Sequence, residues 1–147
     1  MKLIKFQDLS FEEKVEVWQW RNDKSIRKWM FHQQLISLQE HLKFIDTLSD
    51  KKIYLKVEDI GVVNFKNLGD FVEIGLHKNP NKNNVGSKLL AIAIDYAFTV
   101  LQAKKILICV LKNNKRALHI YRKFGFIETA INKNIITMEL IDENWQP

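Results

Sequence analysis

The stretch LHKNPNKNNVGSKLLAIAIDYAFTVL, residues 76–101, combines a strand end, a polar loop and a helix. Pro80 has a fixed φ and no backbone N–H, so the strand is expected to end near it. Asn84 is a candidate N-cap for a helix that starts at about Val85, where apolar residues follow helical spacing. The first turn contains Gly86 and no acidic side chain. Free amides at the positive end of a helix dipole suit a phosphate or pyrophosphate, and an ordinary capped helix after a strand explains the residues equally well.

Length and composition indicate one globular domain over residues 1–147. Hydrophobic residues make up 46% of the chain and charged residues 27%, which is ordinary for a protein with a real core. Cys109 is the only cysteine, so an intrachain disulfide is excluded and a reducing compartment is favoured. We find no signal-peptide pattern and no apolar run that could span a membrane. We therefore expect a cytoplasmic protein.

The formal net charge is +6, but the lysines and arginines are spread along the chain without a block of five or six. Zinc-ligand spacing and the aromatic signature of RNA-binding domains are both missing. The sequence therefore predicts neither a nucleic-acid partner nor a bound metal. A small ligand that carries phosphate groups is the more specific expectation.

The sequence predicts an α/β fold with a mixed sheet and helices on both faces. The expected helices start at capping residues and run over 10–22, 23–30, 37–49, 85–101 and 114–125. The expected strands span 2–6, 53–57, 60–65, 71–77, 105–111, 126–130 and 135–141. A meander of three strands followed by two βα units then builds the sheet.

A second motif, NKRALHIYRKFGF, begins at Asn114. Asn114 can cap a helix, Ala117 leaves room beside it, and Tyr121 lies one turn further on the same side. Gly125 is suited to end the helix. Each residue also has an ordinary role in a cap or a core, but together, downstream of Gly86, they resemble the GCN5-related N-acetyltransferase (GNAT) family. The resemblance covers nearly the whole chain, and the motif matches the later helix of that family almost position for position.

The pyrophosphate loop of that family reads Arg or Gln, two residues, Gly, one residue, then Gly or Ala. Here the aligned positions are Asn81, Asn84 and Gly86, so only Gly86 matches outright. Asn84 is tolerable in place of glycine, because asparagine adopts the left-handed conformation more readily than most residues. Asn81 lacks the cation that would meet the phosphates, and Lys82 or Lys88 are candidates to replace it.

The resemblance implies a GNAT fold in which two neighbouring parallel strands splay apart and acetyl-CoA lies in the gap, without a metal. The splayed strands would be the one that ends at His77 and the one at 105–111. The acetyl-CoA-binding residues implied by the resemblance are Leu76, Lys82, Asn84, Val85, Gly86, Ser87, Lys88, Asn114, Ala117 and Tyr121.

The resemblance also implies that an amine attacks the thioester directly, without a covalent enzyme intermediate. Tyr121 matches the tyrosine that stabilises or protonates the leaving thiolate. Many members carry a glutamate where this chain has Cys109, which we expect to be a core thiol. Candidates for the general base are His77, Glu73 and a water held by Asn64. His77 is preferred, because the ordinary pKa of histidine suits base work near neutrality.

The N-terminal third carries the acceptor side in this family. Arg21-Asn22 resembles two branches, one that acetylates ribosomal-protein N-termini and one that acetylates amino groups on nucleotide-linked deoxy sugars. The Trp29-Met30-Phe31 run followed by a His-Leu-Lys-Phe helix resembles the second branch, which implies a UDP-linked 4-amino-4,6-dideoxy sugar as acceptor. The acceptor-binding residues implied are Arg21, Trp29, Met30, Phe31, Phe44 and His77. A protein N-terminal acetyltransferase, a non-enzymatic acyl-carrier-binding module and a homodimer all remain open.

Overall fold

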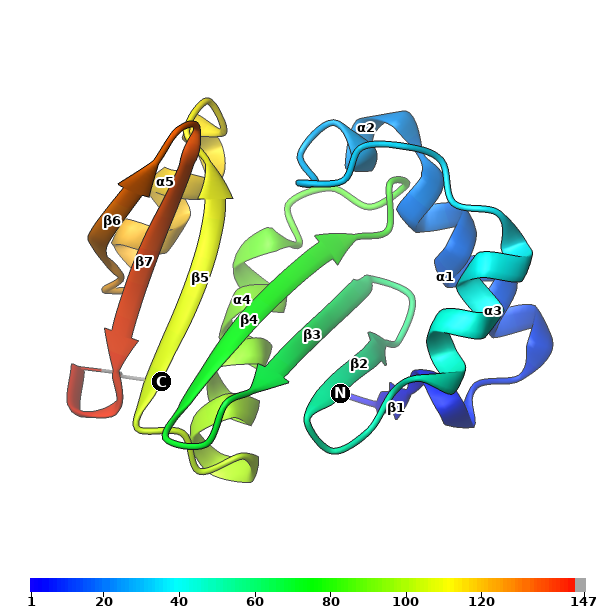
Figure 1. Cartoon of the computed structure of the whole chain (residues 1–147), viewed down its shortest axis with the longest axis horizontal. Coiled ribbons are helices and arrows are strands. Elements are labelled where there is room, and N and C mark those ends of the chain that lie inside the picture. The colour runs from blue at the N-terminus through cyan, green and yellow to red at the C-terminus, as the bar shows by residue number, and fades with distance from the viewer. Residues whose placement is uncertain (145–147) are drawn as a thin grey trace.

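The computed structural model describes residues 1–144, and within them seven strands form one sheet in the order β1-β2-β3-β4-β5-β7-β6 (Figure 1). Only β4 and β5 pair in parallel, and the other neighbours are antiparallel. The sheet is therefore mixed, as predicted. The strands are β1 (Leu3–Lys5), β2 (Lys52–Val57), β3 (Gly61–Asn67), β4 (Phe71–Lys78), β5 (Lys105–Leu111), β6 (Ile127–Asn132) and β7 (Ile135–Ile141).

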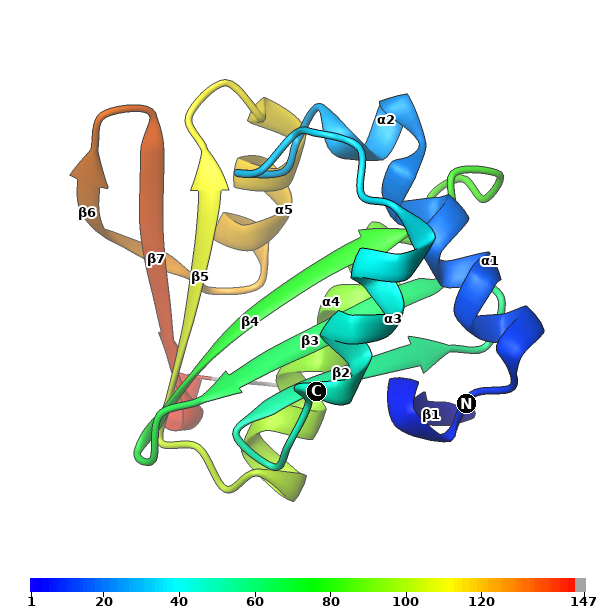
Figure 2. The same ribbon diagram turned by 45° about the vertical axis from the view of Figure 1, so that its right-hand side comes forward.

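Helices cover both faces of the sheet, which confirms the predicted layers (Figure 2). One face of the first four strands carries α1 and α3, and the opposite face of the sheet carries α4 and α5. The α-helices are α1 (Phe11–Asn22), α2 (Lys24–Arg27), α3 (Leu38–Asp46), α4 (Gly86–Asp95) and α5 (Lys115–Lys123). None of the helices within residues 1–144 has the length and apolar character needed to cross a membrane.

Two apolar cores hold these layers together. The larger lies between the sheet and the helices α4 and α5, with Phe65, Leu90 and Met138 almost fully buried. The smaller lies under α1 and α3 and contains Val17 and Ile45. Burial of large apolar side chains on both faces contributes most of the stabilisation, at about 25 cal/mol per Å² of apolar area.

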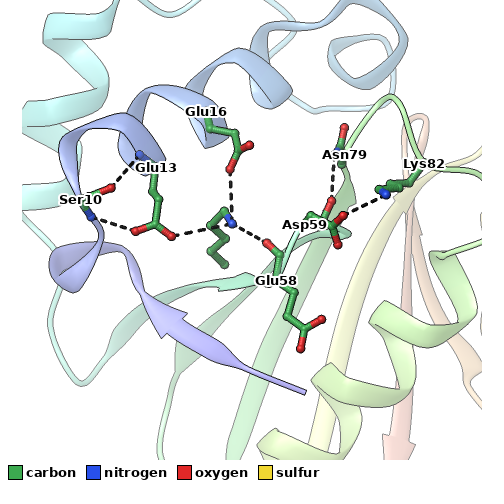
Figure 3. Close-up of polar contacts among 8 residues, drawn as sticks. Ser10, Glu13, Glu16, Glu58, Asp59, Asn79 and Lys82 are labelled. Atoms are coloured by element: carbon green, nitrogen blue, oxygen red, sulfur yellow. Dashed lines mark hydrogen bonds and ion pairs between the residues drawn. The ribbon is translucent and has the colours of Figure 1, made fainter.

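The N-terminal end of α1 matches its prediction. The hydroxyl of Ser10 accepts a hydrogen bond from the Glu13 amide, and the Glu13 carboxylate accepts one from the Ser10 amide, which forms a complete capping box (Figure 3). Lys56 of β2 is buried beneath α1, and its Nζ lies 3.3 Å from Oε1 of Glu16. The same Nζ donates to the Glu58 carbonyl at 2.6 Å. These contacts fix α1 over the sheet.

The helix predicted at 23–30 is shorter in the structure. Asp23 caps it as expected, by accepting from the Ser25 amide at 2.9 Å, but α2 ends at Arg27. The chain from residue 28 to residue 37, here called the 28–37 segment, is irregular. The Asn22 side chain makes two hydrogen bonds with the backbone of Ile36, at 2.7 and 3.0 Å. These side-chain bonds take the place of the backbone bonds that further helical turns would make. Trp29 and Met30, predicted to be helical, therefore lie outside the helix.

The predicted N-cap of the central helix was wrong. Asn84 has a φ of 58°, in the left-handed region, and the residue at the N-cap is Val85, which makes no side-chain cap bond. This φ agrees with the expectation that asparagine is tolerable at the position of the motif glycine, because asparagine adopts the left-handed conformation more readily than most residues. The helix begins at Gly86 and ends at Asp95, and a π-helical turn continues to residue 100.

The strands β4 and β5 diverge as the family resemblance implies. They pair only from Phe71 to Ile74 on β4 and from Lys105 to Ile108 on β5. Beyond that point β4 keeps its pairing with β3 as far as Lys78, and β5 keeps its pairing with β7 to the end of the strand. The result is an opening at one end of the sheet, visible in Figure 1.

Candidate active site

The N-terminus of α4 presents free amides at this end of the sheet. The first amide that bonds back within the helix belongs to Leu89, so the amides of residues 86–88 have no intrahelical acceptor. A Cβ built on Gly86 would meet only the side chain of Ile120, at 3.8 Å. The fold therefore does not require a glycine here. Inside a helix, glycine even lowers stability by about 1 kcal/mol relative to alanine. A bare backbone at this point suits the close approach of a phosphate.

The loop before α4 is held by the turn between β2 and β3 (Figure 3). The buried side chain of Asn79 donates to the Asp59 carbonyl at 2.8 Å and accepts from the Asn81 amide at 3.0 Å. Lys82 forms an ion pair with Asp59 at 2.9 Å. The hydrogen bond and charge of Lys82 lower the pKa of the Asp59 carboxyl. Lys82, one of the two cations predicted to replace the missing one, is thus engaged with Asp59.

The helix α5 has the cap and the end that the second motif predicts. Asn114 caps it by accepting from the Ala117 amide at 3.3 Å, and Gly125 ends it with a φ of 101°. Tyr121 packs against the core beside Phe126, with ring centroids 6.1 Å apart. Burial raises the pKa of Tyr121 to about 12, so its phenol keeps its proton at neutral pH and can donate a hydrogen bond.

A cavity of about 260 Å³ lies on the other face of the sheet, between α1, α3 and the strands β2 and β4. It brings together three of the residues predicted to bind the acceptor, namely Arg21, Phe44 and His77. Its full lining is Phe6, Val17, Arg21, His32, Ile36, His41, Phe44, Tyr54 and His77. The lining is apolar on most sides, with one permanently charged group.

Arg21 is that charged group. Its Nη2 donates to the His32 carbonyl at 2.7 Å, which holds the 28–37 segment over the cavity. Its Nη1 is buried and has no hydrogen-bond partner among residues 1–144. Burial lowers the pKa of the guanidinium, and no carboxylate lines the cavity. A buried cation without a counter-charge is costly, and an anionic or carbonyl oxygen of a ligand would relieve that cost.

His77 also faces the cavity with an unused ring nitrogen. Its Nε2 is buried and has no hydrogen-bond partner within the described chain. Burial, and to a lesser degree the charges of Arg21 and His41, lower the pKa of His77 to about 3. This pKa differs from the ordinary value on which the base prediction rests. At neutral pH the imidazole is uncharged and can accept a hydrogen bond, but it binds a proton weakly.

The other candidate bases and Cys109 lie along the same face of the sheet. Asn64 lies against Gly75, where a Cβ would come within 2.7 Å of its Oδ1. Glu73 is half-buried two residues earlier on β4. The Cys109 sulfur lies 3.7 Å from the Thr137 hydroxyl, and burial raises its pKa, which keeps it a thiol at neutral pH. Within residues 1–144 no three His, Cys, Asp or Glu side chains are grouped so that they could hold a metal ion.

The remaining predicted residues lie around the opening and not inside the cavity. Trp29 and Phe31 are 40% and 56% exposed on the 28–37 segment, and Met30 between them is half-buried. That segment lies at the end of the sheet where β4 and β5 diverge (Figures 1 and 2). Leu76 lies in the part of β4 that no longer pairs with β5. The other predicted acetyl-CoA residues, Val85, Ser87 and Lys88, belong to the start of α4.

Sequence reasoning missed six lining residues, namely Phe6, Val17, His32, Ile36, His41 and Tyr54. Two of them carried a usable signal. His41 stands three residues before Phe44 on α3, so both lie on one face of that helix. Tyr54 alternates with Ile53 and Leu55 on β2 and therefore points to the opposite face of the sheet.

Comparison with known families decides the class of this protein. Residues 5–127 match the acetyltransferase (GNAT) domain family. The chain belongs to the GNAT family. Acetyltransferase PseH of Campylobacter jejuni strain 81-176 is 35% identical over 133 residues, which cover 86% of this chain and 84% of that protein. Spermidine N(1)-acetyltransferase of Escherichia coli K12 is 30% identical over 138 residues, which cover 84% of this chain and 72% of that protein.

Solved structures of GNAT proteins agree with this assignment. The crystal structure of Campylobacter jejuni PseH in complex with acetyl coenzyme A superposes with a TM-score of 0.79 and 29% identity, covering 96% of this chain and 98% of that one. Spermidine N-acetyltransferase of Vibrio cholerae, in complex with CoA and spermine, gives a TM-score of 0.83 at 21% identity, over 97% of this chain and 96% of that one. The second likeness concerns the fold alone.

This GNAT protein is therefore an acetyl-CoA-dependent N-acetyltransferase. Its own residues fit that co-substrate, because free amides and a sterically unneeded glycine lie at the start of α4 beside the diverging strands. Acetyl-CoA supplies the thioester whose acetyl group is transferred.

Proposed function

We propose that this GNAT enzyme acetylates the 4-amino group of UDP-4-amino-4,6-dideoxy-N-acetyl-β-L-altrosamine, a step of pseudaminic acid biosynthesis for flagellin glycosylation. The likeness to PseH over 86% of the chain supports this choice. The observation that carries it is the unpaired cation of Arg21 in a cavity with no carboxylate. In the proposed complex, Arg21 binds an oxygen of the nucleotide sugar.

The charge of the cavity argues against a cationic acceptor. A polyamine would bring further positive charge beside Arg21, and the lining offers no acidic side chain to receive it. A sugar nucleotide carries two phosphates and several carbonyl oxygens, each of which can accept from a guanidinium. The sign of the buried charge thus favours the PseH-like acceptor over a spermidine-like one, although both kinds of relative match the chain.

The shape of the cavity fits one part of such a ligand. About 260 Å³ is below the usual range of about 300–1,000 Å³ for small-molecule sites, so a whole nucleotide sugar does not fit inside. Phe44 meets Tyr54 edge-on, with ring centroids 4.9 Å apart, and gives an apolar wall for the 6-methyl group. We place the rest of the nucleotide sugar against the run of Trp29, Met30 and Phe31 beside the opening, where Trp29 and Phe31 are exposed.

Two side chains take the chemical roles in this proposal. The neutral ring of His77 accepts a hydrogen bond from the uncharged acceptor amine through Nε2 and orients its lone pair for attack. As the C–N bond forms and the C–S bond breaks, the amine gives up a proton to solvent and the departing CoA thiolate takes one up from solvent. Tyr121 donates its proton into a hydrogen bond with the leaving sulfur. A phenol with a pKa of about 12 holds its proton more tightly than a free phenol, so hydrogen bonding is favoured over complete proton transfer.

An acetylation assay with a panel of amines tests the acceptor. The panel holds the UDP-linked 4-amino-4,6-dideoxy sugar, spermidine and a ribosomal-protein N-terminal peptide, each with acetyl-CoA at saturation. We expect the sugar nucleotide to have the highest kcat/KM by about 100-fold or more. Rapid acetylation of the peptide or of spermidine, with none of the sugar nucleotide, would overturn the proposal. Acetylation of the peptide would promote the ribosomal N-terminal acetyltransferase.

A further inference from the structure

The phosphate loop of this GNAT protein lacks a cation where the family motif has one. Asn81 occupies that position, and its amide is bonded to the Asn79 side chain. Lys82 cannot fill the gap without breaking its ion pair with Asp59, and its backbone carbonyl accepts from the Lys78 ammonium at 2.6 Å. The ion pair ties the Lys82 ammonium to the side of the loop that faces the turn between β2 and β3 (Figure 3).

A second cation reaches the loop from another helix. Arg116 lies in the first turn of α5, and its Nη2 donates to the Asn84 side-chain oxygen at 3.3 Å. Asn84 is the left-handed residue two positions before the first residue of α4. The contact therefore brings a guanidinium, from 32 residues away in the sequence, to the end of α4 that carries the free amides.

The guanidinium of Arg116 has N–H donors left for a ligand. It has five N–H donors, and Asn84 takes one of them. The side chain is exposed, and among residues 1–144 it forms no ion pair. Arginine binds phosphate oxygens through two parallel N–H donors, which a lysine cannot do.

We propose that Arg116 binds the pyrophosphate of acetyl-CoA and replaces the cation that Asn81 does not supply. In this arrangement the amides at the start of α4 contact the phosphates from one side and Arg116 contacts them from α5. The bond to Asn84 keeps the guanidinium in place before the ligand arrives, which lowers the entropy lost on binding. The proposal rests on acetyl-CoA as co-substrate and is independent of the identity of the acceptor.

Calorimetric titration of the acceptor-free protein with acetyl-CoA tests this assignment. Arg116→Ala is expected to raise Kd by about tenfold or more, because a charge-assisted bidentate contact is lost. The matched control is Lys115→Ala, which removes a neighbouring exposed cation on the same turn. It is expected to change Kd by less than about threefold. An unchanged Kd in Arg116→Ala, or an equal loss in Lys115→Ala, would overturn the proposal.

Arg116→Gln separates phosphate binding from support of the loop. Glutamine can still donate to Asn84 but carries no charge. We expect a Kd close to that of Arg116→Ala and a weaker salt dependence than in the wild type. A wild-type Kd in Arg116→Gln would mean that Arg116 only holds Asn84. The melting temperature without ligand should stay unchanged in all variants, because the side chain is exposed.

A truncated co-substrate identifies the phosphate concerned. With 3′-dephospho-acetyl-CoA, the ratio of Kd between Arg116→Ala and wild type should stay the same, since the pyrophosphate is still present. If the ratio falls to about one, Arg116 meets the 3′-phosphate, and the assignment to the pyrophosphate is wrong.

Discussion

The two faces of the sheet present different kinds of chemical group to a ligand. The face with α4 and α5 offers acetyl-CoA a helix start, a bare Gly86 and two asparagines that shape the loop and cap α5. The face with α1 and α3 has a cavity lined by side chains from separate elements, where we propose that the acceptor binds. Backbone amides suit a ligand that is the same throughout a family, whereas side chains can be exchanged to suit different amines. Such a division lets one fold serve different acceptors while the co-substrate site stays the same.

Tyr121 of α5 is the proposed donor to the leaving sulfur, so its loss should give the largest effect. Tyr121→Phe removes the donor to the leaving sulfur and keeps the packing beside Phe126. We expect kcat to fall by about 100-fold or more while the Kd of acetyl-CoA stays unchanged. Steady-state kinetics over a range of pH and calorimetry measure the two quantities. A variant with the wild-type kcat at every pH would mean that Tyr121 only packs.

Gly86 tests the co-substrate face alone. Gly86→Glu places bulk and negative charge at the free amides, and we expect the Kd of acetyl-CoA to rise by at least about tenfold. Gly86→Ala is the sharper variant, because its Cβ meets only Ile120. It should raise the free energy of unfolding by up to about 1 kcal/mol and keep the Kd of acetyl-CoA near the wild-type value, because the family loop has Gly or Ala at this position. Urea titration and calorimetry measure the two quantities. Wild-type affinity in Gly86→Glu would remove this site from consideration.

These two faces also differ in how far the sequence predicts them. Caps such as Ser10 and Asn114 use local side-chain bonds, so residue type and spacing were enough to place α1 and α5. Asn84 shows the limit, because an asparagine suits an N-cap and a left-handed residue alike, and the sequence does not separate the two. The error at α2 had a long-range cause, since Asn22 holds the backbone of Ile36 fourteen residues away.

The cavity was harder to predict than the co-substrate face. Strand alternation indicates which way Tyr54 points, but not which helix covers it. His41 lies on the buried face of α3, and its Nε2 is 3.1 Å from the Lys14 carbonyl. From the sequence, a histidine at such a position looks like an ordinary core residue. Only the packing of α1 and α3 on β2 and β4 brings these residues together with Arg21.

Arg21 tests the acceptor face alone. Arg21→Met keeps most of the apolar side-chain volume and removes the unpaired charge. The KM of the sugar nucleotide should rise by about tenfold with no change in the Kd of acetyl-CoA. The matched control is Lys24→Met, an exposed cation at the start of α2. An unchanged KM in Arg21→Met would show that the cavity does not select the acceptor by charge.

His77 should give the smallest effect, a change in the pH dependence of stability. The pKa of His77 is about 3 in the folded protein and about 6.5 in the unfolded chain. At pH values between these two, His77 therefore binds more protons in the unfolded chain than in the folded protein. The free energy of unfolding therefore rises with pH in this window, and stability is lost as the pH falls from about 6.5 towards 3. Urea titrations at about pH 7.5 and about pH 5 should show a smaller difference for His77→Gln than for the wild type.

The exposed His32 is the matched control, and His32→Gln should keep the wild-type difference. Arg21→Met should reduce the difference partway, because the charge of Arg21 helps to lower the pKa of His77. A wild-type difference in His77→Gln would mean that the ring takes up a proton in the folded state near its ordinary pKa. The pH dependence of kcat/KM would then change as well. If the ring of His77 stays neutral, it produces no acidic limb near pH 6.5 in the pH profile of kcat/KM. A limb seen there would then belong to the acceptor amine or to another group. A ring that takes up a proton near its ordinary pKa would itself produce such a limb.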